Sequence, residues 1–327
     1  AGISVASGNR VSSIGFMGCP LRCWWCHNPE SQDPEPFVHY DPGRCLRCGE
    51  CVDACPRGAL SLTSAGIVTD AGRCDRTGAC AEACPAEART LVGRSVSAGD
   101  LVDEVESDRL YFEQSGGGVT FSGGEPLLQW RFLAEALAEC GRREIHRAVD
   151  TSGFASPEVL LRVARETDLF LYDLKCMDPA LHRQVTGVPL EPILDNLVRL
   201  GEAGSRVEVR IPLVPGITTD AHIERSAEFL APLRGIQGVR LLPFHRSAKE
   251  KHRRFGLPWL MERDDEIPGP TAERWADAFR RRGIRVVTQD FHHPVYPQLY
   301  NGFQDQLSIV DLIFNCGPES AEVILGG

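Results

Sequence analysis

Short apolar runs alternate with longer amphipathic segments through most of this chain. The runs have the length and the apolar content of buried strands, and near-continuous apolar strands between helices are typical of a parallel sheet. The pattern therefore predicts an α/β fold. The predicted strands are 10–17, 119–121, 148–149, 169–172, 207–212, 239–244 and 284–287. The predicted helices between them are 96–114, 127–140, 157–165, 194–202, 223–233 and 271–282.

Candidate chemistry begins directly after the first predicted strand. Cys19, Cys23 and Cys26 follow it with the spacing Cys-x3-Cys-x2-Cys. Three thiolates cannot complete the four ligands of a tetrahedral zinc, but they can hold three corners of an iron-sulfur cube. The fourth iron would then stay open. An open metal position is what separates a catalytic site from a closed structural one.

Composition narrows the class of protein. The formal net charge of −10 argues against non-specific binding of nucleic acid. The sequence contains no run of 18 apolar residues, so no membrane-spanning helix is predicted. The chain does not start with a basic and apolar signal peptide, so we expect a cytoplasmic protein. Ten of the 13 cysteines lie between Cys19 and Cys84 in ligand-like spacings. Metal-sulfur ligation in a reducing cytoplasm accounts for them better than a secreted disulfide framework.

A ferredoxin-like repeat follows the first cysteine loop. Its first copy has the bacterial ferredoxin spacing, in which the fourth cysteine ligates the other cluster and a proline follows it. The cysteines of this copy are Cys45, Cys48, Cys51 and Cys55. A second copy follows a hairpin-like stretch at 63–70, and its cysteines are Cys74, Cys80 and Cys84.

The second copy lacks one ligand, because Thr77 stands where the first copy has Cys48. If the fourth cysteine of each copy ligates the cluster of the other copy, then one cluster is bound by Cys45, Cys48, Cys51 and Cys84. Cys55, Cys74 and Cys80 remain for the other. Three outcomes are open: a three-iron cluster, a cube with a non-cysteine fourth ligand such as Asp75, or no second cluster. We favour a bound cluster with unusual ligation.

The cysteine loop also carries a resemblance. The string from Gly18 to Glu30 resembles the radical S-adenosylmethionine (SAM) superfamily, and within it the glycyl radical enzyme activating enzymes such as the pyruvate formate-lyase activases. The resemblance covers roughly residues 1–288 and is supported by Gly-Gly-Glu-Pro at 123–126 and Leu-Leu-Pro-Phe-His at 241–245. It implies a partial (β/α)6 TIM-type barrel, in which chemistry gathers at the carboxyl ends of the strands.

The resemblance also implies a division of the chain into four parts. These are 1–37, the first strand and the SAM-cluster loop; 38–92, a ferredoxin-like insert with two cluster sites; 93–288, the rest of the barrel; and 289–327, a tail of unknown role. Cys140, Cys176 and Cys316 fit no ligand spacing, so we interpret them as buried or incidental thiols.

Several residues receive roles from the resemblance alone. Cys19, Cys23 and Cys26 would ligate the catalytic cluster. Gly123, Gly124 and Glu125 would contact the SAM amino group. A monovalent cation beside the SAM carboxylate would be bound by Asp150, Thr151 and Asp173. The carboxylate and the ribose of SAM would be bound by Lys175, Arg210 and His245. Trp25 would lie near the adenine. Residues 177–187 resemble a family loop whose role here is undetermined.

The function implied is activation of a partner protein. Reductive cleavage of SAM would give methionine and a 5′-deoxyadenosyl radical, which removes a hydrogen from a glycine Cα of a glycyl radical enzyme. Flavodoxin or ferredoxin would donate the electron, the insert would relay it, and we expect a monomer. Two alternatives remain, namely a radical SAM enzyme acting on a small molecule or peptide, and an iron-sulfur electron carrier.

Overall fold

A computed structural model describes residues 2–6, 9–263 and 265–287 of the chain. The chain divides into two units, 1–287 and 288–327, and the account below concerns the first. The predicted tail 289–327 and Cys316 lie outside the described residues.

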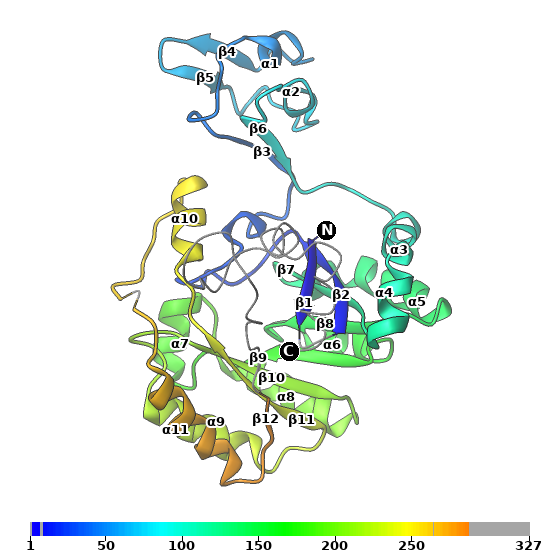
Figure 1. The fold of residues 1–327 in the computed structure, drawn as a ribbon, viewed down its shortest axis with the longest axis vertical. Coiled ribbons are helices and arrows are strands. Elements are labelled where there is room, and N and C mark those ends of the chain that lie inside the picture. The colour runs from blue at the N-terminus through cyan, green and yellow to red at the C-terminus, as the bar shows by residue number, and fades with distance from the viewer. Residues whose placement is uncertain (1, 7–8, 264, 288–327) are drawn as a thin grey trace, which may run out of the picture. The chain divides into compact units, whose positions relative to one another are not determined.

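A sheet of eight strands organises the described unit (Figure 1). Its order is β1-β2-β7-β8-β9-β10-β11-β12, and every neighbouring pair from β2 to β12 is parallel, whereas β1 is antiparallel to β2. The predicted α/β fold with a parallel sheet is therefore confirmed. The strands are β1 (Gly2–Ala6), β2 (Asn9–Phe16), β7 (Gly118–Gly123), β8 (His146–Thr151), β9 (Leu169–Asp173), β10 (Val207–Leu213), β11 (Ile236–Pro243) and β12 (Val286–Val287).

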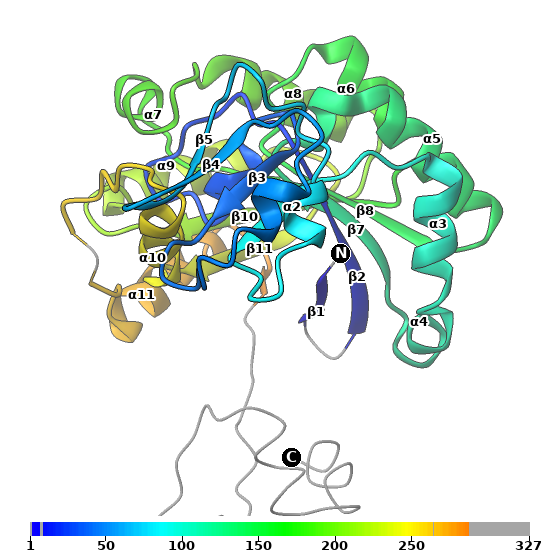
Figure 2. The ribbon, with the colours of Figure 1, turned by 90° about the horizontal axis from the view of Figure 1, so that it is seen from above.

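Helices connect the parallel strands, and α3, α5 and α6 lie along the outer side of β7 and β8 (Figure 2). No helix within the described ranges is long and apolar enough to cross a membrane. The helices of the barrel are α3 (Ala98–Glu106), α4 (Arg109–Ser115), α5 (Trp130–Arg142), α6 (Pro157–Ala164), α7 (Pro179–Thr186), α8 (Glu191–Glu202), α9 (Asp220–Leu230), α10 (Ser247–Arg254) and α11 (Gly269–Arg280), with 3-10 turns η1 (Pro29–Ser31) and η2 (Pro126–Gln129).

The core lies between the sheet and these helices. Phe121, Val149 and Phe170 project from neighbouring strands and are fully buried, as are Leu133 and Leu160 on α5 and α6. Side chains alternate along β10, where Val207, Val209, Ile211 and Leu213 are buried and the residues between them are half-buried. This alternation leaves Arg210 on the opposite face of the strand from the helices' core residues.

One predicted helix is wrong. The expected helix 96–114 is two helices, because the chain turns at Ser107 and Asp108 between α3 and α4. Ser12 on β2 donates a hydrogen bond of 2.5 Å to the Asp108 carboxylate, and this bond fixes the turn to the sheet. Leu110, placed on the apolar face of the expected helix, is consequently 71% exposed.

The cysteine-rich segment is inserted between β2 and β7, which are adjacent in the sheet. β3 and β6 pair as antiparallel strands at the two ends of the insert, and β4 and β5 form the hairpin expected between the two copies. Each copy carries one four-residue helix. The elements are β3 (Phe37–Tyr40), α1 (Glu50–Asp53), β4 (Leu60–Thr63), β5 (Gly66–Thr69), α2 (Ala79–Glu82) and β6 (Arg89–Val92).

Candidate active site and iron-sulfur sites

The loop with Cys19, Cys23 and Cys26 leaves the carboxyl end of β2 and rests on the end of α7. Arg22 N–H donates to the carbonyl of Thr186 at 2.7 Å, and Trp24 N–H donates to the carbonyl of Val185 at 3.0 Å. Carbonyls at the end of a helix lack partners within the helix, so they are free to accept these bonds. The end of α7 thus fixes the backbone of the cysteine loop.

This contact explains the loop 177–187, whose role the sequence left undetermined. Asp178 caps the start of α7 by accepting a hydrogen bond of 2.9 Å from Leu181 N–H, and Gly187 ends the helix with a φ of 82°. His182 is fully buried between them, and its Nδ1 lies 2.9 Å from the carbonyl of Val188. The motif therefore builds the helix on which the cysteine loop rests.

The three thiols of the loop are free and half-buried. Burial raises the pKa of the Cys19 thiol to about 11 and that of the Cys23 thiol to about 12. Both thiols pack against the apolar core. Thiolates in such a place need a strong positive partner, and the metal of an iron-sulfur cluster provides one. Three thiols on one loop therefore fit three corners of a cluster.

Gly123 and Gly124 bring the end of β7 against the start of the cysteine loop. A Cβ on Gly123 would lie 2.3 Å from the backbone N of Phe16, and one on Gly124 would lie 2.2 Å from the carbonyl oxygen of Gly18. Gly124 N–H donates to Phe16 and Glu125 N–H to Gly18, both at 2.8 Å. The chain's own backbone therefore requires glycine at both positions, whether or not a ligand is bound.

The Glu125 side chain is buried and accepts hydrogen bonds on both oxygens. Oε1 accepts from Thr151 Oγ1 at 2.6 Å, and Oε2 accepts from Ser152 N–H at 2.9 Å and Ser152 Oγ at 2.6 Å. Desolvation raises the pKa of this carboxyl, and the hydrogen bonds from Ser152 and Thr151 oppose that shift. Glu125 and Thr151 thus join β7 to β8, while their predicted contacts with SAM and a cation stay predictions.

Two carboxylates lie at the carboxyl ends of β8 and β9, with one guanidinium between them. Arg210 on β10 forms ion pairs with Asp150 and with Asp173, the second at 2.8 Å. Ser122 Oγ donates to Asp150 at 2.6 Å. Desolvation raises the pKa of Asp150, whereas Arg210 and Lys175 hold the pKa of Asp173 below its usual value against its own desolvation. The parallel register brings these groups together from positions far apart in sequence.

Lys175 links this ion-pair network to the cysteine loop. Its Nζ lies 2.8 Å from Asp173, and its charge lowers the pKa of both Cys19 and Cys23. Burial lowers the pKa of Lys175, but the charge of Asp173, the Cys23 thiolate and the hydrogen bond to Asp173 together raise it above its ordinary value, so the ammonium form persists. His245 follows β11, and its ring centroid lies 6.5 Å from that of His27 on the loop. The structure thus gathers Lys175, Arg210 and His245 on the side of the sheet where the cysteines lie.

Trp25 lies in a second, smaller apolar cluster. Its side chain is buried with Val185, Val214 and Phe244, and Cys176 packs in the same cluster. Cys140 is buried in the main core, so both unassigned thiols within the described residues are buried as predicted. The expected position of Trp25 near adenine stays a prediction.

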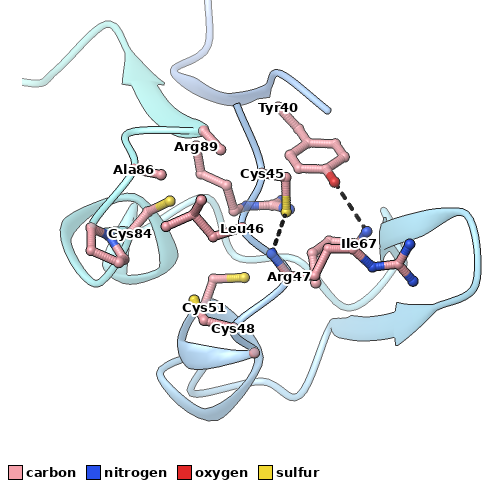
Figure 3. Close-up of a pocket in the computed structure, with 13 residues that line it drawn as sticks. Tyr40, Cys45, Leu46, Arg47, Cys48, Cys51, Ile67, Cys84, Ala86 and Arg89 are labelled. Carbon is pink, nitrogen blue, oxygen red and sulfur yellow. Dashed lines mark hydrogen bonds between the residues drawn. The ribbon is translucent and has the colours of Figure 1, made fainter. Parts of the chain in front are cut away.

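The first cluster site of the insert brings together the four predicted ligands. Figure 3 shows the sulfur atoms of Cys45, Cys48, Cys51 and Cys84 around one cavity. Cys84 comes from the second copy, as the crossing rule predicts. Arg47 N–H donates to Cys45 Sγ at 3.4 Å, a bond that favours a thiolate. Four thiols around one cavity fit a complete cube.

The second cluster site has three thiols and two oxygen-bearing side chains. Its cavity is lined by Cys55, Cys74 and Cys80 together with Asp75 and Thr77. Ala59 N–H donates to Cys55 Sγ at 3.3 Å, which parallels the bond at Cys45 in the first site. The site therefore lacks only the thiol that Thr77 replaces.

Three family profiles match parts of the chain. Residues 74–230 match the radical SAM superfamily, and residues 37–98 match the 4Fe-4S dicluster domain. Residues 260–323 match the WbqC-like protein family.

Two curated relatives are similar over most of the chain. The trans-4-hydroxy-L-proline dehydratase activating enzyme of Clostridioides difficile is 43% identical over 80% of this chain and 87% of its own length. The choline trimethylamine-lyase activating enzyme of Oleidesulfovibrio alaskensis is 36% identical over 84% of this chain and 90% of its own length. This chain belongs to the glycyl radical enzyme activating enzymes.

A solved structure supports the fold alone. Streptococcus suis SuiB, bound to its precursor peptide SuiA, matches with a TM-score of 0.51 and 12% identity, over 84% of this chain and 47% of that one.

Membership establishes the function at the level of the family. The activating enzyme is a radical SAM enzyme that uses iron-sulfur clusters and SAM to activate a glycyl radical enzyme. The recognition made from the cysteine loop, the enzyme class and the requirement for these cofactors are confirmed.

Sequence reasoning missed the contribution of α10 to this activating enzyme. Lys251 donates to Asn28 Oδ1 at 3.0 Å and to Glu30 Oε1 at 2.9 Å, and His252 Nε2 lies 3.1 Å from the carbonyl of Cys26. The helix therefore holds the far end of the cysteine loop. No local pattern indicates these contacts, because Lys251 and Asn28 are 223 positions apart. Ser122 was also missed, although its place at the end of β7 beside Asp150 on β8 could have indicated it.

Proposed function

We propose that Cys19, Cys23 and Cys26 hold the cluster that cleaves SAM in this activating enzyme. One observation carries the proposal. The ammonium group of Lys175, which lowers the pKa of the Cys19 and Cys23 thiols, forms an ion pair with Asp173, and Asp173 also pairs with Arg210. A thiol triad beside two fixed cations suits a substrate that carries a carboxylate next to its metal-binding group. The cluster, when bound, supplies one electron to the sulfonium of SAM.

The chain's own groups would then orient the substrate. Arg210 can grip a carboxylate through two parallel N–H groups, and Lys175 adds a second positive charge near the cysteines. The backbone of 123–125 would bind the amino group, while Trp25 and His245 would bind the nucleoside part. SAM and one electron give methionine and a 5′-deoxyadenosyl radical. The radical takes a hydrogen atom from a glycine Cα of the partner, which leaves 5′-deoxyadenosine and a glycyl radical.

A monovalent cation would bind between Asp150 and Asp173 when SAM is present. In the chain alone Arg210 occupies this place. Removing the guanidinium from two buried carboxylates is costly unless another cation replaces it. Binding of the SAM carboxylate to Arg210 and of a cation to the two acids would therefore support each other.

The insert would carry electrons from a flavodoxin or ferredoxin to the catalytic cluster. We further infer that the activating enzyme is monomeric and works in the cytoplasm, where the clusters stay reduced. The two cluster cavities of the insert support the relay, because each is lined by at least three of the predicted cysteine ligands.

The relay is tested by removing one ligand of the complete first site. Cys48→Ala in the full chain should leave SAM cleavage by dithionite close to that of the wild type, because dithionite is small and can reduce the catalytic cluster directly. Cleavage driven by reduced flavodoxin should fall by about tenfold or more. A tenfold loss of rate corresponds to an activation free energy that is higher by about 1.4 kcal/mol. Cys140→Ala, a thiol in the main core, is the matched control.

Two results would contradict the proposal in different ways. Equal flavodoxin-driven rates in Cys48→Ala and the wild type would exclude a relay through the first site. Loss of cleavage with dithionite as well, at unchanged iron content of the catalytic loop, would mean that the insert takes part in the chemistry itself.

A further inference from the structure

The two copies in the insert have nearly the same backbone around their cluster sites. Arg47 and Arg76 both have positive φ values, 58° and 57°, and the glycines that precede α1 and α2 have φ values of 88° and 87°. Positive φ is uncommon for arginine, so its repetition indicates that the same cluster-binding turn is kept in both copies. Thr77 therefore stands at the ligand position of Cys48.

The second cavity has also kept its thiols. Cys55, Cys74 and Cys80 line one cavity, as the four cysteines of the first site line another. Three thiols that still share one cavity, on a backbone that repeats the turn of the first site, indicate that the second site still holds a cluster.

A carboxylate lines the cavity next to the position without a thiol. Asp75 Oδ1 accepts hydrogen bonds from Thr77 N–H at 3.3 Å and from Thr77 Oγ1 at 3.1 Å. Asp75 Oδ2 faces Arg57 Nε at 3.4 Å. A carboxylate has about four lone-pair sites, so Oδ2 can bind iron while Oδ1 keeps its bonds to Thr77. Among the residues that line this cavity, Asp75 alone carries a carboxylate.

We propose that Asp75 is the fourth ligand of the second cluster and that Thr77 positions it. The inference rests on the proposed role of the insert as a cluster-binding relay. A single carboxylate oxygen is a harder ligand than a thiolate and prefers harder cations, so it holds this iron less firmly than the thiolates hold the other three. The second site is therefore a cube with one exchangeable iron.

Loss of this iron is an oxidation with a defined balance. A [4Fe–4S]2+ cluster gives one electron to an added oxidant, ferricyanide, and releases one Fe2+ to solution, which leaves [3Fe–4S]+ on Cys55, Cys74 and Cys80. Addition of Fe2+ and one electron from dithionite reverses the change. The catalytic loop also has three thiols and an open corner, so its contribution has to be removed before the second site is measured.

The experiment therefore uses the full chain with Cys19, Cys23 and Cys26 changed to alanine. After anaerobic reconstitution, iron is counted and the EPR signal of [3Fe–4S]+ is recorded before and after ferricyanide. This parent should hold about eight irons, four per complete cube, and should lose about one on oxidation as the signal develops. Thr77→Cys in the same background should keep all eight and show no signal.

Variants of Asp75 test the ligand itself. Asp75→Ala and Asp75→Asn should hold about seven irons before any oxidant is added, four in one site and three in the other, with the [3Fe–4S]+ signal already present. Asp75→Asn keeps an oxygen for Thr77 to bond, so it separates loss of ligation from loss of the hydrogen bonds. Leu46→Ala changes the residue that matches Asp75 in the first copy and should behave like the parent.

Three results would overturn the assignment. Eight irons in Asp75→Asn would mean that another group ligates the fourth iron, and seven in the parent without uptake of Fe2+ would mean a permanent three-iron cluster. Four irons in the parent would mean that the second site is empty. SAM cleavage by the wild-type chain with dithionite is measured in parallel, so failure of the assignment is distinguishable from failure of the proposed function.

Discussion

The catalytic loop and the second site of the insert each offer three thiols and lack a fourth. At the loop, the thiols lie beside Lys175, which pairs with Asp173 within a buried ion-pair network. At the insert, Asp75 and Thr77 line the cavity beside the position without a thiol, and Asp75 pairs with the exposed Arg57. A missing thiolate opens an iron in both places. The charged groups around the opening decide whether it receives a substrate or only an exchangeable ligand.

The largest expected difference between the two sites is in SAM cleavage. Cys26→Ala should lower the dithionite-driven yield of 5′-deoxyadenosine by more than about 100-fold, since changes beside a metal ligand alone cost about 10- to 100-fold. Cys80→Ala, which removes a ligand of the second insert site, should leave that yield close to the wild-type value. Equal losses in the two variants would erase the proposed distinction between the sites.

A second difference concerns stability. Arg210→Leu leaves Asp150 and Asp173 buried without their guanidinium, so the free energy of unfolding should fall by about 3–5 kcal/mol. Arg57→Leu removes an ion pair in which the arginine side chain is 66% exposed. Such a pair contributes about 0–1 kcal/mol. Anaerobic urea titrations followed by circular dichroism compare the two variants, and similar midpoints would show that the network is not tightly coupled to the fold.

The smallest expected effect is at α10, which holds the far end of the catalytic loop. Lys251→Met removes the bonds to Asn28 and Glu30 and should slow dithionite-driven SAM cleavage by about tenfold, the lower end for groups that position metal ligands. Arg253→Met on the same helix is the control, because within the described part of the chain the Arg253 side chain pairs with Glu250 of α10 and does not bond to the cysteine loop. Equal initial rates of 5′-deoxyadenosine formation in these two variants would exclude a positioning role for Lys251.

Local patterns were sufficient for the parts of this molecule that depend on neighbouring residues. The parallel strands follow from short apolar runs, and the cluster sites follow from cysteine spacing, including the crossing of Cys84 to the first copy. The turn between α3 and α4 was missed because it depends on Ser12, which is 96 positions away from Asp108.

Contacts between distant segments also changed the interpretation of predicted site residues. Gly123 and Gly124 are required by the backbone of the cysteine loop, and Glu125 joins β7 to β8 through Thr151 and Ser152. A sequence motif indicates that these residues belong to the site. It does not indicate which of them face a ligand and which position the others, because that depends on how the strands are paired.

The central claim is that the cysteine loop cleaves SAM. The most direct test is an anaerobic assay of the reconstituted wild-type chain with SAM and dithionite, with iron counted in the same sample. The account predicts 5′-deoxyadenosine and methionine in equal amounts from a chain that holds about twelve irons, four per complete cube. A full load of iron without 5′-deoxyadenosine would contradict it and would favour an electron carrier.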